Sequence, residues 1–242
     1  MKVSIVTPSF NQAEFLEETI LSVLNQTYRD IEYIIIDGGS TDGSVDIIKK
    51  YADRLTYWVS EKDRGQAHAI NKGFEKCTGD IFAYLNSDDL LELDAVEKIV
   101  NAYQQKPNAA IIYGKCTNID EQSKTINEAQ GASIEFIELL KYTMLPKMHQ
   151  PACFFNKRFL NRAPLFREDL TYVMDYELIL WLMKNRSVKF IDEKIACFRY
   201  HDASKTVSKV KEMYLEKMQI QRQYGPSYQL LWLWRRIKHY LS

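Results

Sequence analysis

The sequence predicts an α/β fold, with a mostly parallel central sheet flanked by helices and a helical extension at the C-terminus. Short apolar segments alternate with amphipathic segments through the first half of the chain, as in sheets whose parallel strands are joined by helices. The 242 residues are 46% hydrophobic and 26% charged. This size and composition are enough for one domain with a substantial core.

The first half predicts five strands and four helices. The strands are expected at residues 2–7, 31–36, 55–59, 80–85 and 109–113. The second of these is almost continuously apolar, as expected of a strand covered on both faces. The helices are expected at residues 13–26, 44–51, 66–76 and 92–105. Asn11 is expected to cap the first helix, because Asn is favoured at that position.

The second half is less regular. Residues 118–132 are polar and predict a loop, residues 134–142 and 175–184 predict helices, and residues 152–155 and 195–200 predict strands. No low-complexity linker or repeat divides the chain, so one compact domain is expected up to residue 204. The tail, residues 205–242, carries eight cations and two anions, a net charge of +6. Its residues 228–242 fit an amphipathic helix that either packs on the domain or contacts anionic lipid.

Charge and hydropathy exclude several classes of protein. The 32 Lys and Arg residues balance 32 Asp and Glu residues, which argues against a general nucleic-acid binder. No apolar run is long enough for a transmembrane helix or a signal peptide, so a cytoplasmic location is expected. The four cysteines lack the spacing of a zinc or redox motif and are expected to be small buried residues.

Polar clusters follow two of the predicted strands, where ligands of parallel sheets bind. Residues Asn86, Ser87, Asp88 and Asp89 follow the fourth strand. They predict either a site for Mg²⁺ or Mn²⁺ or an N-cap for the next helix. Asp37, followed by Gly38 and Gly39, predicts either a tight turn or a ribose or base contact. No dinucleotide fingerprint or P-loop occurs, so phosphate charge must be met by a metal or by basic side chains.

Three further residues are candidates, each with an ordinary structural alternative. Arg64 could clamp a phosphate or lie in solvent as a surface cation. Asp175 opens a predicted helix, where a carboxylate often serves only as a cap. His201 follows a predicted strand, where it could be a ligand or a structural hydrogen-bond donor.

Taken together, the order and spacing of these segments resemble the family 2 glycosyltransferases. The resemblance covers residues 1–204 and begins with residues 7–11, 22–27 and 37–44. It continues through residues 65–73 and 79–89, and then through Gln150-Pro151, residues 174–178 and residues 198–201. It implies a GT-A fold, with a nucleotide-sugar-binding half at 1–115, an acceptor half at 116–204, and residues 205–242 as a basic amphipathic helical tail.

The resemblance also implies roles for individual residues. Thr7, Pro8 and Phe10 would lie on the nucleobase side of the donor site, and Asp37 would bind the uracil or ribose. Asp63, Arg64 and Asn71 would shape the donor site, and Asn86 and Ser87 would contact the donor. Asp88 matches the metal-binding carboxylate of the family's D-x-D motif, His201 would approach the metal or diphosphate, and Asp175 matches the general base. Asn86 stands where the motif commonly begins with Asp, which weakens the metal assignment.

The implied activity is inverting, Mn²⁺- or Mg²⁺-dependent transfer of a hexosyl or N-acetylhexosaminyl group. The donor would be a nucleotide sugar, with a UDP-sugar favoured, and the acceptor a glycan or a lipid-linked hydroxyl in surface polysaccharide synthesis. A non-catalytic nucleotide-sugar or glycan-binding module is the alternative. A sugar-phosphate nucleotidyltransferase would require a Gly-rich basic loop after the first strand, and residues 8–12 lack one.

Overall fold

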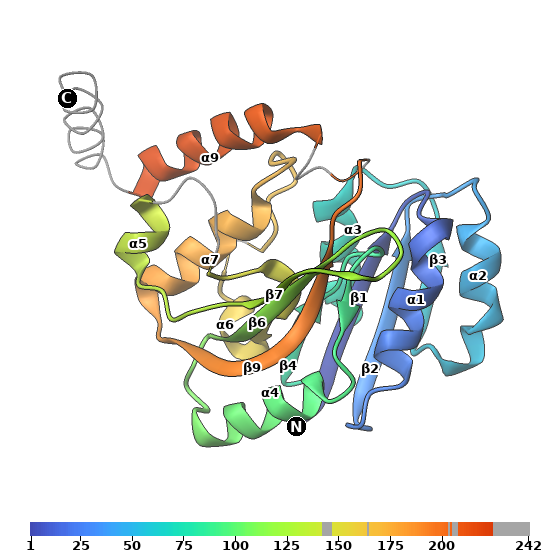
Figure 1. The fold of residues 1–242 in the computed structure, drawn as a ribbon, viewed down its shortest axis with the longest axis horizontal. Coiled ribbons are helices and arrows are strands. Elements are labelled where there is room, and N and C mark those ends of the chain that lie inside the picture. Colours follow the sequence, from blue (N-terminus) through green and yellow to red (C-terminus); the bar gives the residue numbers. More distant parts are fainter. Residues whose placement is uncertain (142–146, 164, 203, 205–207, 225–242) are drawn as a thin grey trace.

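The computed structural model describes residues 1–141, 147–163, 165–202, 204 and 208–224. In these residues a nine-stranded sheet has the order β3-β2-β1-β4-β8-β6-β9-β5, and β7 pairs with β6 (Figure 1). Helices cover both faces of the sheet. The predicted α/β fold class is therefore confirmed.

The first half follows the predicted alternation closely. Strands β1 (Val3–Ser9), β2 (Ile31–Asp37), β3 (Tyr57–Ser60) and β4 (Ile81–Tyr84) are joined in parallel pairs, with β1 between β2 and β4. Helices α1 (Ala13–Leu24), α2 (Ser44–Lys50), α3 (Gln66–Lys76) and α4 (Ala95–Gln105) lie near the predicted positions, and a 3-10 turn spans Ala52–Arg54. The carboxyl ends of these strands consequently share one edge of the sheet.

The second half adds antiparallel pairing. Strand β8 (Cys153–Asn156) pairs antiparallel with both β4 and β6 (Ile111–Ile119), and β9 (Val188–Arg199) runs parallel to β6. The short β5 (Leu90–Leu91) pairs with β9. The loop predicted at 118–132 is wrong, because β6 continues to Ile119 and β7 (Thr125–Gln130) pairs with it as a hairpin. The side chains of β7 are almost all exposed, so its sequence shows no apolar alternation.

Four helices and one 3-10 turn complete the described part of the second half. They are α5 (Phe136–Lys141), the 3-10 turn Gln150–Ala152, α6 (Lys157–Leu160), α7 (Met174–Asn185) and α9 (Val210–Tyr224). Within the described residues, no helix is long and apolar enough to cross a membrane. The amphipathic helix predicted at 228–242 lies outside the described residues.

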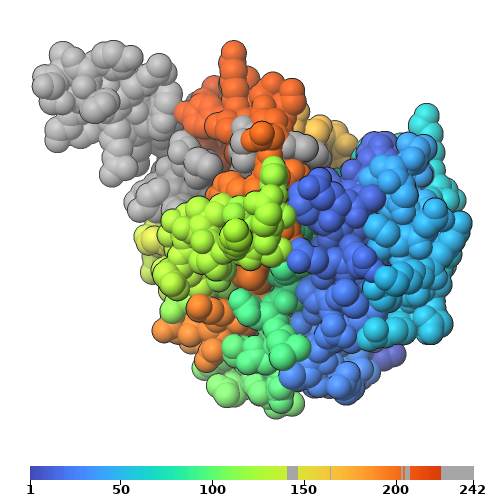
Figure 2. Space-filling view, turned by 45° about the vertical axis from the view of Figure 1, so that its right-hand side comes forward, coloured from blue at the N-terminus to red at the C-terminus, as the bar shows by residue number. Residues whose placement is uncertain are grey.

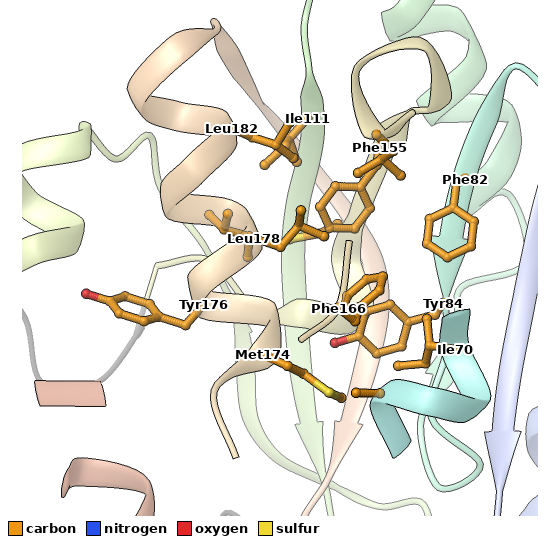
Figure 3. Close-up of a cluster of buried hydrophobic side chains, with 14 of the residues drawn as sticks. Ile70, Phe82, Tyr84, Ile111, Phe155, Phe166, Met174, Tyr176, Leu178 and Leu182 are labelled. Atoms are coloured by element: carbon orange, nitrogen blue, oxygen red, sulfur yellow. The ribbon is translucent and has the colours of Figure 1, made fainter. Parts of the chain in front are cut away.

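Two apolar cores lie on opposite faces of the sheet. Alternate residues of β2 divide between them: Ile34 and Ile36 join the core under α3, α5 and α7, and Tyr33 and Ile35 join the core under α1, α2 and α4. Figure 3 shows the first core, where Tyr84 and Phe166 lie close to Met174 at the start of α7. Figure 2 shows the blue and cyan N-terminal part of the first half side by side with the yellow-green and orange parts of the second half. Packing of the two halves brings α7 to the carboxyl edge of the parallel strands.

The predicted cap of α1 by Asn11 is wrong. The helix begins after Gln12, which makes no side-chain cap, and the NH of Ala13 donates to Asp42 at 2.8 Å. Asn11 adopts a left-handed backbone with φ of 51°, and its side chain accepts the NH of Thr41 at 2.9 Å. Asp42, from the loop after β2, therefore takes the place of a local cap.

Candidate functional site

A cleft of about 800 Å³ opens where the loops after β1, β2, β3 and β4 meet the start of α7. Seven of the predicted site residues line it: Pro8, Phe10, Asp63, Asn86, Ser87, Asp88 and Asp175. They come from both halves of the chain. The fold thus gathers residues separated by more than 160 positions into one concave site.

Phe10 and Gly38 shape one side of this cleft. The ring of Phe10 is 60% exposed. A Cβ atom on Gly38 would lie 2.9 Å from an Asp63 carboxylate oxygen and 3.2 Å from the Phe10 ring. Glycine at this position therefore allows the loops after β1, β2 and β3 to approach one another. The exposed ring offers a flat apolar face beside a carboxylate, on which a planar aromatic group could stack.

Asp37 is buried beneath the loop that follows β2. Its carboxylate accepts the NH groups of Gly39 and Ser40 at 3.0 and 2.9 Å, and the hydroxyls of Ser40 and Ser60 at 2.5 and 2.6 Å. Asp37 does not line the cleft, whereas Gly38 and Gly39 do. In this conformation the carboxylate holds the loop that follows β2 to the ends of β2 and β3.

Four other predicted residues also lie outside the cleft lining: Thr7, Arg64, Asn71 and His201. The hydroxyl of Thr7 is buried and hydrogen-bonds to that of Tyr33 at 3.0 Å. Asn71 exchanges two hydrogen bonds with the backbone of Phe166, and Arg64 forms an ion pair with Glu168 at 2.7 Å. Asn71 and Arg64 thus fasten α3 and its preceding loop to the segment that leads to α7.

Asp88, which lines the cleft, and His201, which lies just outside its lining, form a hydrogen-bonded pair. The Oδ2 atom of Asp88 lies 2.9 Å from Nε2 of His201, whose ring is buried against Phe15 at 4.8 Å between centroids. Neighbouring ligands of an octahedral metal with bonds of about 2.1 Å stand about 3 Å apart, so this spacing suits a shared divalent cation. No group of three His, Cys, Asp or Glu residues suited to a metal occurs in the described part of the chain. The pair therefore fits a cation whose other ligands come from a substrate and water.

Asn86 is held in a network of amide side chains that sequence reasoning missed. Its Oδ1 accepts from Gln66 at 2.6 Å, and its Nδ2 faces the carbonyl oxygen of the Gln150 side chain at 3.4 Å. Gln150 in turn donates to the backbone carbonyl of Tyr84 at 2.8 Å. The Nδ2 group, which a carboxylate lacks, faces acceptors on Gln150 and Asp89, so this network accommodates Asn where the motif commonly has Asp. The engaged Oδ1 makes Asn86 a poorer metal ligand than Asp88.

Arg199 is the second feature that the sequence did not reveal. Its side chain is fully buried, and its Nε donates to the backbone carbonyl of Asp88 at 2.8 Å. Its other nitrogens reach Glu18 at 2.6 Å and the turn between β6 and β7. The backbone NH of Arg199 donates to Asp89, whose pKa is raised well above its usual range, chiefly by burial and then by the neighbouring Asp88. Arg199 thus fixes the loop that carries Asp88.

Asp175 lines the cleft from the first turn of α7, and its Oδ1 accepts the NH of Tyr176 at 2.7 Å. Helix α9 holds this turn. The carboxylate of Glu216 accepts three successive NH groups, those of residues 171–173, at 2.7–3.0 Å. Lys217 is buried beside the Tyr176 ring, 4.3 Å from its centroid. Burial lowers the pKa of Lys217 to about 8, although nearby Asp175 opposes this shift.

The family model of Glycosyl transferase family 2 matches residues 4–167. The chain belongs to this family. It is 30% identical over 221 residues to an uncharacterised glycosyltransferase of Rickettsia typhi, covering 87% of this chain and 68% of that protein. It is 31% identical over 193 residues to a chondroitin synthase of Escherichia coli, covering 79% of this chain and 28% of the synthase. The chain therefore spans about two thirds of the first relative and less than a third of the second.

Solved structures share the fold of this family 2 glycosyltransferase. S. aureus TarS 1-349 in complex with UDP-GlcNAc has a TM-score of 0.70 at 15% identity, covering 93% of this chain and 71% of that one. The mannosyltransferase PcManGT from Pyrobaculum calidifontis, in complex with GDP-Man and Mn²⁺, has a TM-score of 0.60 at 19% identity. That match covers 81% of this chain and 56% of PcManGT. These likenesses identify the architecture as GT-A-like.

Proposed function

We propose that this chain is an inverting, metal-dependent glycosyltransferase that moves a hexosyl or N-acetylhexosaminyl group from a UDP-sugar to a hydroxyl of a glycan or lipid-linked acceptor. The observation that carries the proposal is the presence of two differently placed carboxylates, Asp88 and Asp175, on the walls of one cleft. A leaving group can meet the first while an acceptor meets the second.

The reaction requires one displacement at the anomeric carbon. Asp175 accepts the proton of the acceptor hydroxyl, and the hydroxyl oxygen forms the new bond from the face opposite the donor. The bond to the nucleoside diphosphate breaks, and its oxygen keeps the electron pair, which inverts the anomeric centre. A base of this kind typically contributes a factor of about 10² to 10⁴ to the rate.

Asp88 and His201 would hold the divalent cation. When bound, Mn²⁺ or Mg²⁺ neutralises charge on the departing diphosphate. Arg199 keeps the backbone of Asp88 in place for this contact, since its Nε donates directly to the Asp88 carbonyl. The Asp88–His201 spacing supports this assignment.

The nucleoside would bind at the side of Pro8, Phe10 and Asp63. The exposed Phe10 ring supports stacking with a base, and the described complexes of S. aureus TarS with UDP and UDP-GlcNAc favour a UDP-sugar. Direct contacts with the donor remain predictions for six other residues: Thr7, Asp37, Arg64, Asn71, Asn86 and Ser87. We further propose the division into a donor half at 1–115, an acceptor half at 116–204 and a tail at 205–242.

The cellular role proposed is surface polysaccharide synthesis at the cytoplasmic face of the membrane. The similarity to a chondroitin synthase, which is a polysaccharide-forming enzyme by name, supports this class of acceptor. The basic tail would supply a peripheral membrane contact through residues 228–242.

A non-catalytic nucleotide-sugar-binding module is the second candidate. The observation that favours it is the Oδ1 atom of Asn86, which is already engaged by Gln66 rather than aimed at a metal. Such a module would bind the donor but would neither transfer the sugar nor hydrolyse the donor.

Thermal-shift titration with UDP, GDP and dTDP, each with and without Mn²⁺, tests the donor assignment. A ligand that binds the folded state raises the unfolding midpoint. We expect a rise with UDP that requires Mn²⁺ and disappears in Asp88→Ala. The absence of any nucleotide response would contradict the proposal, and UDP binding without turnover of any UDP-sugar would favour the module.

A further inference from the structure

A second cavity of about 470 Å³ lies away from the cleft. Its polar lining consists of three arginines, Arg158, Arg162 and Arg186, together with Asn108, Asn185 and Ser187. No acidic side chain lines the cavity among the described residues. The lining thus combines three positive charges with amide and hydroxyl donors.

Two of the three arginines pack on one buried ring. The guanidinium carbons of Arg158 and Arg186 lie 4.6 and 4.8 Å from the centroid of Phe159, which is 7% exposed. Arg158 also donates to the side-chain oxygen of Asn108 at 3.1 Å. Phe159 and Asn108 therefore hold the side chains of Arg158 and Arg186 at the cavity before any ligand arrives.

This charge is not balanced within the described part of the protein. None of the three arginines forms an ion pair there, whereas Arg64, Arg167 and Arg199 each do. All three arginines are exposed, and an anion that enters the cavity meets three positive charges with no carboxylate in the described lining. Guanidinium groups provide paired donors that match the oxygens of phosphate.

The cavity lies where the strands begin, whereas the cleft lies where the parallel strands end. Asn108 precedes β6 and Ser187 precedes β9, so both stand where these strands begin. Strand β6 runs in the same direction as β4, since both pair antiparallel with β8. The cleft lies where β4 ends. The two sites consequently occupy different ends of the molecule.

We propose that this cavity is a second ligand site, which binds a phosphate group through Arg158, Arg162 and Arg186. The phosphate is borne either by a soluble molecule or by a lipid headgroup, and both sources share the same recognition chemistry. The site is independent of the donor cleft and of its assigned activity.

Inorganic phosphate is the probe for the first experiment, followed through the arginine Nε–Hε NMR signals of the whole chain. We expect saturable shifts for Arg158, Arg162 and Arg186, and none for Arg54, which donates to the carbonyl of Leu24 far from the cavity. Arg162→Gln should weaken phosphate binding about tenfold, equivalent to about 1.4 kcal/mol. Arg162 is exposed, and its side chain forms no hydrogen bond or ion pair with the described residues that its replacement would break.

Lys189→Gln is the matched control, because it removes one exposed positive charge near the start of β9 without lining the cavity. It should change phosphate affinity less than twofold. The proposal is overturned if no saturable shift occurs, or if both variants weaken binding equally.

Sedimentation with phosphatidylcholine vesicles containing phosphatidylglycerol identifies the source of the phosphate. Vesicle binding that falls in Arg162→Gln but not in Lys189→Gln assigns the site to a lipid headgroup. Saturable phosphate binding without such vesicle binding assigns it to a soluble phosphate compound. Both results support the site, whereas equal vesicle binding by all three proteins together with no NMR shift refutes it.

Discussion

The two carboxylates that face the cleft are positioned in different ways. Asp88 follows β4 and is fixed by Arg199, a fully buried side chain that also reaches Glu18 and the turn between β6 and β7. Asp175 lies at the start of a helix that depends on α9, through Glu216 and Lys217. The carboxylate that we propose for the donor side is thus built into the sheet, whereas the carboxylate that we propose for the acceptor side relies on an attached helix. We expect donor binding and acceptor chemistry to be separable by mutation.

Asp175→Asn should have the largest effect on catalysis. Loss of the base should lower turnover about 10²- to 10⁴-fold, while UDP affinity stays similar because the donor side is untouched. The measurements are turnover with the donor identified by the nucleotide screen and UDP binding by calorimetry.

Asp169→Asn is the control for that variant, since Asp169 is an exposed partner of Arg167 outside the cleft lining. It should leave turnover close to that of the unaltered protein. Normal turnover in Asp175→Asn would remove Asp175 as the base.

Arg199→Lys tests the donor-side support. A lysine cannot reproduce the several directions in which the guanidinium donates, so the carbonyls of Asp88 and of the β6–β7 turn lose donors. We expect a loss of about 3 kcal/mol in the free energy of unfolding, measured by urea denaturation. Weaker Mn²⁺-dependent UDP binding should accompany it. Arg29→Lys, at an exposed position, should leave both unchanged, and matching urea midpoints for the two variants would refute the assigned role.

The sequence allowed the first half of the chain to be predicted far better than these supports. Its strands and helices are consecutive and strongly periodic, so local patterns determine β1 to β4 and the cluster that follows β4. The strand β7 escaped prediction because its side chains are exposed. Arg199 and Glu216 could not be assigned roles, since they act on residues 111 and 43–45 positions away, respectively. A charged residue among apolar ones, as Arg199 is in β9, is the one signal that could have marked such a support.

Lys217→Met tests the support that α9 gives to the start of α7, through the pH dependence of the protein's stability. The folded protein releases the proton of Lys217 near pH 8, because burial lowers its pKa from the ordinary value of 10.5. Between pH 8 and 10.5 the unfolded chain binds more protons, so this group makes the unaltered protein more stable as pH rises. At pH 7 Lys217 is still charged in the folded protein, and burial of this charge lowers the stability. Lys217→Met removes that cost and should be more stable at pH 7 by about 1–3 kcal/mol. The advantage should shrink as pH rises toward 10.

The measurement for Lys217 is urea denaturation at pH 7, 8, 9 and 10. Lys211→Met is the control, since Lys211 lies exposed on the same helix. Its stability relative to the unaltered protein should not vary with pH. A constant difference between Lys217→Met and the unaltered protein would show that Lys217 does not titrate in this range.

Glu216→Ala should produce the smallest and most local change. The NH groups of residues 171–173 lose their shared acceptor but can bond to water, so we expect a loss of about 1 kcal/mol. Hydrogen exchange should speed up at these three amides and at the start of α7, while the amides of β1 and β4 keep their protection. Glu212→Ala, which removes only a surface ion pair with Lys209, should change neither. If exchange at residues 171–173 stays slow in Glu216→Ala, then α9 is not what holds Asp175 at the cleft, and the contrast between the two carboxylates fails.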